Sequence, residues 1–154
     1  MKSILWCLAF VGALILSGCG GGGGSSEESS AGSATESPFN VGAKAAESPV
    51  DEQLAEVGEG LFKTKTCSTC HAFGKRVTGP DLSGVTQRRT EAWMEQQILH
   101  PDVMTKTDPI SRDLLAKYVT QMPNLMLKQE EAKALIEYIK HKDHETSPAT
   151  AATP

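Results

Sequence analysis

The stretch Cys67-Ser68-Thr69-Cys70-His71 decides how the rest of this sequence is interpreted. Two cysteines separated by two residues and followed at once by a histidine form the attachment pattern of c-type haem. Each cysteine can form a thioether bond to the porphyrin, and the adjacent histidine is placed to bind the iron. We therefore expect one covalent haem c, attached to Cys67 and Cys70, with His71 as an iron ligand.

Two other interpretations of the paired cysteines are weaker. A structural zinc site needs four ligands, and no second pair of Cys or His residues stands at a suitable spacing in the sequence. A thioredoxin-like redox pair is typical of a strand–helix–strand context, and no alternating strand pattern surrounds the motif. The haem interpretation is favoured over both.

The residues around the motif predict helices and loops. Ser48-Pro49 predicts a helix start, because a capping serine followed by proline is typical of the first helical turn. Glycines, prolines and charges predict a loop over residues 72–89. Thr90 predicts the cap of a helix that stops at Pro101, and Asp108-Pro109 predicts the start of the next one.

A break at Met122-Pro123-Asn124 precedes one more predicted helix. Apolar residues at helical spacing indicate its buried face: Ala132, Leu135, Ile136 and Ile139. The predicted domain has few aromatic residues, and a haem packed between helices would supply the missing core. The expected fold class is all-α, a small helical domain around one covalently bound haem.

From residue 58 to residue 140 the order of motifs resembles class I, or monohaem, cytochrome c. The motifs that carry the resemblance are Gly60-Leu61-Phe62, the haem motif at 67–71, Gly79-Pro80-Asp81-Leu82, Trp93 and Met122-Pro123. The resemblance implies a small cytochrome c-like fold with one exposed haem edge, crossed N- and C-terminal helices, and electron transfer.

The resemblance also implies which residues bind the iron. His71 corresponds to the proximal ligand and Met122 to the distal one, since a methionine followed by proline in a loop is usual for this family. The main alternative to Met122 is Met104, which follows Pro101 in an expected loop. Three further residues are weaker candidates for the distal position: Met94, Met126 and His100.

Neighbouring residues are candidates for orienting the haem or its ligands. In the family, the backbone carbonyl of the proline that matches Pro80 bonds the proximal imidazole and fixes its orientation. Arg88 or Arg89, together with Trp93, occupy the region that contacts the haem propionates in many relatives. For the arginines, a solvated charge pair beside a core tryptophan is an equal alternative.

A haem iron with both axial positions filled has no free site for oxygen or peroxide. We therefore expect an electron carrier rather than an enzyme, with a reduction potential raised by the thioether ligand. The expected partners are a quinol-oxidising complex and a terminal oxidase or reductase. The alternatives are an open-site haem enzyme or gas sensor, and a fixed electron-transfer subunit of a larger oxidoreductase.

The first residues predict export and a lipid anchor. Lys2 precedes an apolar run that is too short to span a membrane, so residues 1–18 are predicted to be a signal peptide. The run ends in Leu16-Ser17-Gly18-Cys19, which resembles the bacterial lipobox and predicts lipidation of Cys19. An ordinary signal peptide with a chance cysteine is the alternative. The expected location is the bacterial cell envelope, on the periplasmic side or the outer face of a membrane.

Composition divides the remaining chain into three predicted parts. Residues 19–48, rich in glycine, serine, alanine and glutamate, are expected to form a disordered tether. Residues 49–145 are expected to form the haem domain, and residues 146–154 a flexible tail. The net charge of −4 lacks the strong basic bias of nucleic-acid-binding proteins, so no nucleic-acid partner is expected.

Overall fold

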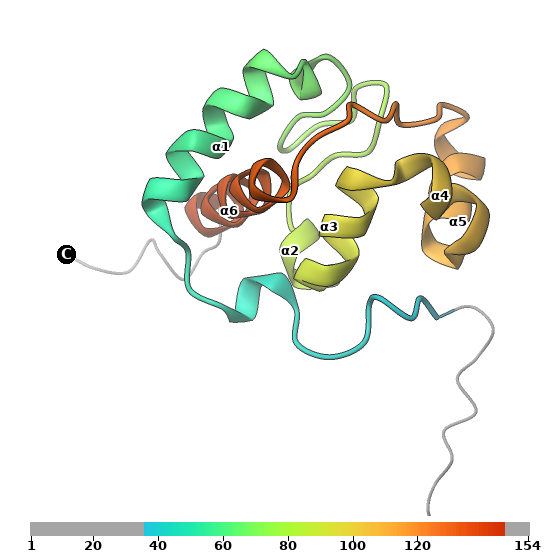
Figure 1. The fold of residues 1–154 in the computed structure, drawn as a ribbon, viewed down its shortest axis with the longest axis horizontal. Coiled ribbons are helices and arrows are strands. Elements are labelled where there is room, and N and C mark those ends of the chain that lie inside the picture. Colours follow the sequence, from blue (N-terminus) through green and yellow to red (C-terminus); the bar gives the residue numbers. More distant parts are fainter. Residues whose placement is uncertain (1–35, 147–154) are drawn as a thin grey trace, which may run out of the picture. The chain divides into compact units, whose positions relative to one another are not determined.

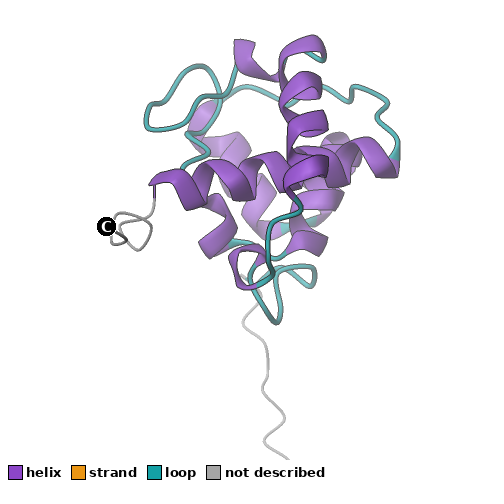
Figure 2. Cartoon of the chain, turned by 90° about the vertical axis from the view of Figure 1, so that its left-hand side faces the viewer, coloured by secondary structure: helices purple, strands orange, loops and turns teal. Residues whose placement is uncertain are grey.

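The computed structural model describes residues 36–146 of the chain. Its elements, in order, are η1 (Ala45–Glu47), α1 (Glu52–Thr64), η2 (Cys67–Thr69), α2 (Val85–Arg88), α3 (Glu91–Leu99), α4 (Pro101–Thr107), α5 (Pro109–Tyr118) and α6 (Gln129–Thr146). Between residues 36 and 146 no strand occurs, and Figure 2 shows helices joined by loops. The predicted all-α class is confirmed.

The predictions for the signal peptide, for Cys19 and for the C-terminal tail fall almost entirely outside the described residues. Among the helices that are described, none has both the length and the apolar character needed to cross a membrane.

Helices α1 and α6 cross in close contact and form what we term the frame of the domain (Figure 1). A Cβ atom built on Gly58 of α1 would lie 1.9 Å from the carbonyl oxygen of Ala134 on α6, so only glycine permits this approach of the two backbones. The apolar face predicted for the last helix is buried throughout: Ala132, Leu135, Ile136 and Ile139. The predicted last helix is confirmed.

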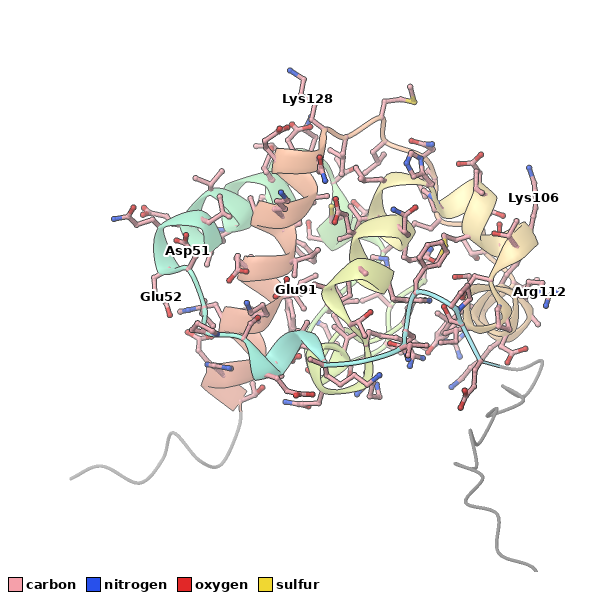
Figure 3. All side chains as sticks on the ribbon, turned by 60° about the horizontal axis from the view of Figure 1, so that its bottom comes forward. Asp51, Glu52, Glu91, Lys106, Arg112 and Lys128 are labelled. Carbon is pink, nitrogen blue, oxygen red and sulfur yellow. The ribbon has the colours of Figure 1, made fainter. Side chains whose placement is uncertain are left out.

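Helix α1 begins later than the sequence predicts. Its cap is Asp51, labelled in Figure 3, whose carboxylate accepts a hydrogen bond from the backbone N–H of Leu54 at 3.0 Å. Ser48 is extended, and the buried ammonium of Lys140 on α6 donates to the Ser48 hydroxyl and to the Pro49 carbonyl, both at 2.8 Å. The prediction that Ser48 caps this helix is wrong, because Ser48 and Pro49 both accept hydrogen bonds from Lys140 and lie outside the helix.

Residues 36–48, which we term the strap, pack against the helical domain (Figure 1). Ala45 is 1% exposed, and its backbone N–H donates to the carbonyl of Arg89 at 2.9 Å. The side chain of Asn40 accepts a hydrogen bond from the backbone N–H of Thr90, also at 2.9 Å.

The predicted disordered tether is therefore wrong over the strap, and for residues 19–35 it stays a prediction. The strap has little apolar surface, as its composition indicates. Its polar and backbone groups instead satisfy backbone groups left free at the junction between α2 and α3, which composition does not reveal.

The predicted starts of α3 and α5 are confirmed. The Thr90 hydroxyl accepts a hydrogen bond from the backbone N–H of Trp93 at 3.1 Å and caps α3. The Asp108 carboxylate accepts one from the backbone N–H of Ser111 at 3.0 Å and caps α5. Each cap uses a side chain only three residues away, so the signal is local.

Helix α4 is absent from the sequence prediction. Pro101 ends α3 as expected, but it also begins α4, because proline at the first helical position sacrifices no hydrogen bond. The helix carries Met104 into the core, where its side chain is 2% exposed. The prediction of an irregular loop at Met104 is wrong.

Two loops complete the described part of the chain. The predicted loop over 72–89 is confirmed up to α2, whose start is held by Asp143 of α6 through the backbone N–H groups of Gly84 and Thr86. Residues 119–128, which we term the distal loop, contain no helix, in agreement with the predicted break at Met122-Pro123.

Candidate haem site

The cysteine motif lies directly after α1 and closes into one tight turn. The backbone N–H groups of Cys70 and His71 donate to the carbonyl of Cys67 at 3.1 and 3.0 Å. Within residues 36–146 both thiols are half-buried and free. Burial raises the pKa of the Cys67 thiol, which opposes the thiolate that a redox-active cysteine pair requires. The environment fits thioether attachment better than thiol–disulfide exchange.

The imidazole of His71 is oriented by the loop that follows it. Its Nδ1 lies 3.0 Å from the carbonyl oxygen of Pro80, and because a carbonyl only accepts, Nδ1 carries the proton and donates. Nε2 of the neutral ring therefore keeps its lone pair, the state in which histidine binds a metal. Gly79 leaves room for the ring, since a Cβ there would lie 2.7 Å from Cε1 of His71.

A cavity of about 600 Å³ lies beside the motif. Its volume falls in the range of roughly 300–1,000 Å³ that is typical of cofactor sites. Six of the predicted site residues line it: Cys67, His71, Pro80, Arg89, Trp93 and Met122. Cys70 is not part of the lining, although the turn keeps it next to His71.

The rest of the cavity wall is mainly apolar and comes from several helices. Its apolar side chains include Val85 of α2, Ile98 of α3, Leu114 and Leu115 of α5, and Leu135 and Ile139 of α6. A large, flat, mostly apolar group suits such a wall, with His71 presenting a nitrogen lone pair. The residues present thus fit a covalently attached haem.

The candidates for the distal ligand lie in different environments. Met122, half-buried in the distal loop, lines the cavity, and so does Met94 of α3, which is 4% exposed and belongs to the core cluster. Met104 is buried away from the lining, and Met126 is 84% exposed. His100 is exposed at the junction of α3 and α4. Met122 is therefore the candidate that lines the cavity from a loop and is not part of the core cluster.

Arg89 and Trp93 form one contact at the cavity wall. The Arg89 guanidinium carbon lies 5.1 Å from the centre of the Trp93 ring, within the range of a cation–π interaction. The indole N–H of Trp93 points to the buried carboxylate of Asp108, to which it donates at 3.1 Å. Arg88 also lines the cavity, so this part of the wall is basic and suits anionic groups.

Among the cavity residues that the sequence did not indicate, Gln97 and Ser111 are connected to Met122 by hydrogen bonds. The side-chain N–H of Gln97 donates to the sulfur of Met122 at 3.8 Å, and the Ser111 hydroxyl donates to the carbonyl oxygen of Gln97 at 2.5 Å. The cap signal at Asp108 could have indicated Ser111, which stands three residues further on. No local signal indicates Gln97, because its role depends on the distal loop coming back over α3.

The cytochrome c family model matches residues 55–143. Cytochrome c-551 from Azotobacter vinelandii is 46% identical over 33 residues, which is 21% of this chain and 40% of that protein. The matched stretch thus spans less than half of that relative's length.

Solved structures with similar folds include cytochrome c from Rhodothermus marinus, with a TM-score of 0.61 and 34% identity over 64% of this chain and 84% of that chain. An engineered variant of that cytochrome gives a TM-score of 0.59 and 33% identity, over 62% of this chain and 83% of the variant. The chain described here belongs to the cytochrome c family of electron-transfer haem proteins and carries covalently bound haem c.

Proposed function

We propose that this protein is a membrane-tethered carrier of single electrons between respiratory redox partners, with His71 and Met122 as the two axial ligands of the haem iron. The observation that carries this proposal is that both side chains line one cavity, with Nε2 of His71 left free for a metal. When bound, haem iron supplies a one-electron redox couple.

The chain's own residues determine what the iron can do. The carbonyl of Pro80 keeps His71 in the tautomer that binds a metal. The Met122 thioether is a soft ligand that favours reduced iron and raises the reduction potential. With both side chains bound, the site excludes oxygen and peroxide, which favours electron transfer over catalysis at the iron.

Substitution of Met122 by alanine tests the ligand assignment. Thioether ligation gives ferric haem a weak long-wavelength charge-transfer band, and Met122→Ala should abolish this band, lower the reduction potential and open the iron to carbon monoxide. Met104→Leu and Met126→Leu are matched controls that keep side-chain volume, and both should retain the band.

The outcomes separate the alternatives. Loss of the band in Met104→Leu instead would transfer the ligand role to Met104. If the unmodified protein lacks the band and binds carbon monoxide readily, the sixth position is open and the enzyme-or-sensor alternative replaces the carrier.

The proposed membrane attachment uses Cys19 as a lipid anchor, with the haem domain in the cell envelope on the periplasmic side or outer face of a membrane. A quinol-oxidising complex is the proposed donor, and a terminal oxidase or reductase the proposed acceptor. Cys19→Ala should release a soluble protein with an unchanged haem spectrum. If the variant still purifies with one large oxidoreductase, the protein is a fixed subunit and not a mobile carrier.

A further inference from the structure

Gln97 of α3 places a hydrogen-bond donor against the proposed distal ligand. Its side-chain Nε2 lies 3.8 Å from the sulfur of Met122, and both residues line the haem cavity. A thioether sulfur can only accept a hydrogen bond. The amide therefore turns its N–H group toward the sulfur and its carbonyl oxygen away from it.

Ser111 of α5 fixes this orientation of the amide. Its hydroxyl donates to the carbonyl oxygen of Gln97 at 2.5 Å. An amide rotated by half a turn would bring carbonyl lone pairs against the sulfur lone pairs. The Ser111 hydroxyl, which also lies 3.2 Å from a carboxylate oxygen of Asp108, would then have to accept from the amide and turn its one hydrogen to that longer contact. The repulsion at the sulfur and the longer contact of the Ser111 hydrogen both favour the orientation in which the N–H group faces Met122.

Asp108 in turn holds Ser111 and joins it to α3. One carboxylate oxygen accepts hydrogen bonds from the Ser111 backbone N–H at 3.0 Å and from the Trp93 indole at 3.1 Å. Asp108 and Ser111 are each 1% exposed. Trp93 and Gln97 stand four residues apart, on the same face of α3. The donor to Met122 is thus supported by two helices that are themselves linked through a buried carboxylate.

We propose that Gln97 is a positioning residue, which orients the Met122 thioether and raises the reduction potential of the haem by withdrawing electron density from the sulfur. This inference rests on the proposed function, in which Met122 is an axial ligand. A hydrogen bond to the sulfur weakens its donation to ferric iron more than to ferrous iron, which favours the reduced state. Such support of a metal ligand by a neighbouring hydrogen bond is common in metal sites.

Gln97→Leu tests the proposal, because leucine approximates the size of glutamine and lacks the donor. The equilibrium constant for reduction should fall by a few-fold, on the order of 30 mV at about 59 mV per tenfold for one electron. The charge-transfer band should shift in position and remain present. Gln96→Leu is the matched control, since Gln96 is the adjacent residue on α3 and does not line the cavity. The control should leave the potential and the band unchanged.

Ser111→Ala provides a second, milder variant that removes one hydroxyl and leaves Gln97 in place. It should lower the potential in the same direction by a smaller amount, because the amide loses its fixed orientation. If Gln97→Leu fails to fold, Ser111→Ala alone decides, and an unchanged potential overturns the proposal. An unchanged potential in a folded Gln97→Leu protein overturns it directly.

The result for Met122→Ala separates this inference from the proposed function. Loss of the band in Met122→Ala, together with an unaltered potential in Gln97→Leu, rejects the role of Gln97 and keeps the ligand. Persistence of the band in Met122→Ala rejects the ligand, and the role of Gln97 with it.

Discussion

The frame and the distal loop contribute to the same cavity but are built in different ways. In the frame, two helices meet so closely at Gly58 that their backbones touch, and the facing side chains of α6 are buried. In the distal loop, Met122 is only half-buried, while Val119 and Met126 are each 84% exposed. The frame supplies most of the packing, and the loop brings a functional side chain to the cavity with little packing of its own.

The distal loop is held by hydrogen bonds from side chains more than by burial. The side-chain N–H of Gln121 donates to the carbonyl of Pro101 at 3.3 Å, and that of Asn124 donates to the carboxylate of Asp102 at 3.0 Å. Both acceptors belong to the first turn of α4. This difference from the frame indicates that the stability of the domain and the position of the proposed ligand Met122 can be altered separately.

The largest change in unfolding free energy is expected for a substitution in the frame. Gly58→Ala would force the Cβ atom into the backbone of Ala134, which cannot move without separating α1 from α6. We expect a loss of unfolding free energy of about 3 kcal/mol or more. Thermal and urea unfolding of the haem-loaded protein would measure it.

Gly60 offers a matched control on the same helix, because a Cβ there would meet nothing within 4 Å. Gly60→Ala should stabilise the protein by about 0.5–1 kcal/mol through the lower entropy of the unfolded chain. Equal effects of the two substitutions would show that helix propensity, and not the contact with α6, sets the requirement at Gly58.

An intermediate effect on the free energy of unfolding is expected at Asp108, which links α3 to α5. Burial by itself raises the pKa of this carboxyl, but the influence of the Ser37 hydroxyl and the hydrogen bonds from Trp93 and Ser111 outweigh it, so the pKa lies below the ordinary value of 3.8. Asp108→Ala should cost about 2 kcal/mol at neutral pH, from the lost helix cap and the unpaired donors.

The pH dependence of that cost has a defined sign. The unfolded chain binds the proton at a higher pH than the folded one, so the ionised Asp108 contributes fully above its ordinary pKa. Its contribution disappears as the pH falls through the lower, folded-state value. Urea unfolding at pH 7 and at low pH would measure this. The difference in unfolding free energy between Asp108→Ala and the unmodified protein should be smaller at low pH. A gap that widens in acid would contradict the lowered pKa.

The smallest change in unfolding free energy is expected for a substitution in the distal loop. Val119 has a φ of 57°, a left-handed conformation that is costly for a β-branched residue, and its side chain is largely exposed. Val119→Asn should raise the unfolding free energy by about 0.5–1 kcal/mol, because asparagine tolerates this conformation. The reduction potential should stay unchanged.

Val103 of α4 provides the comparison for that substitution. It is also partly exposed, at 49%, but lies within a right-handed helix, where valine and asparagine have similar propensities. Val103→Asn should therefore change stability very little. A similar gain at both positions would indicate that removing exposed apolar surface, and not backbone strain, is responsible.

The parts of the fold that could be predicted from the sequence are those with a local signal. The haem motif, the caps at Thr90 and Asp108 and the apolar stripe of α6 each depend on residues a few positions apart. The start of α1 could not be predicted, because Lys140, a residue normally exposed, is buried and takes Ser48 as a partner. Burial of a lysine is decided by contacts far along the chain.

The candidate site follows the same division. The haem motif residues Cys67, Cys70 and His71 could be predicted from their spacing. Met122 could be proposed from the proline that follows it and from the family resemblance. Gln97 could not be predicted, because its contact with Met122 joins residues 25 positions apart. Long-range contacts of this kind arise only when the whole domain is assembled.

The strap also has a consequence for how this domain can be transferred between proteins. A piece cut to the family match, residues 55–143, would leave Trp93 without the neighbouring Ala45 in the core and would strip Lys140 of two of its hydrogen-bond partners. The buried ammonium would keep only its bonds to the carboxylates of Glu91 and Glu137, so truncation at the family boundary is expected to destabilise the domain. A piece of this protein for fusion or grafting should therefore retain the strap in addition to the region that the family model matches.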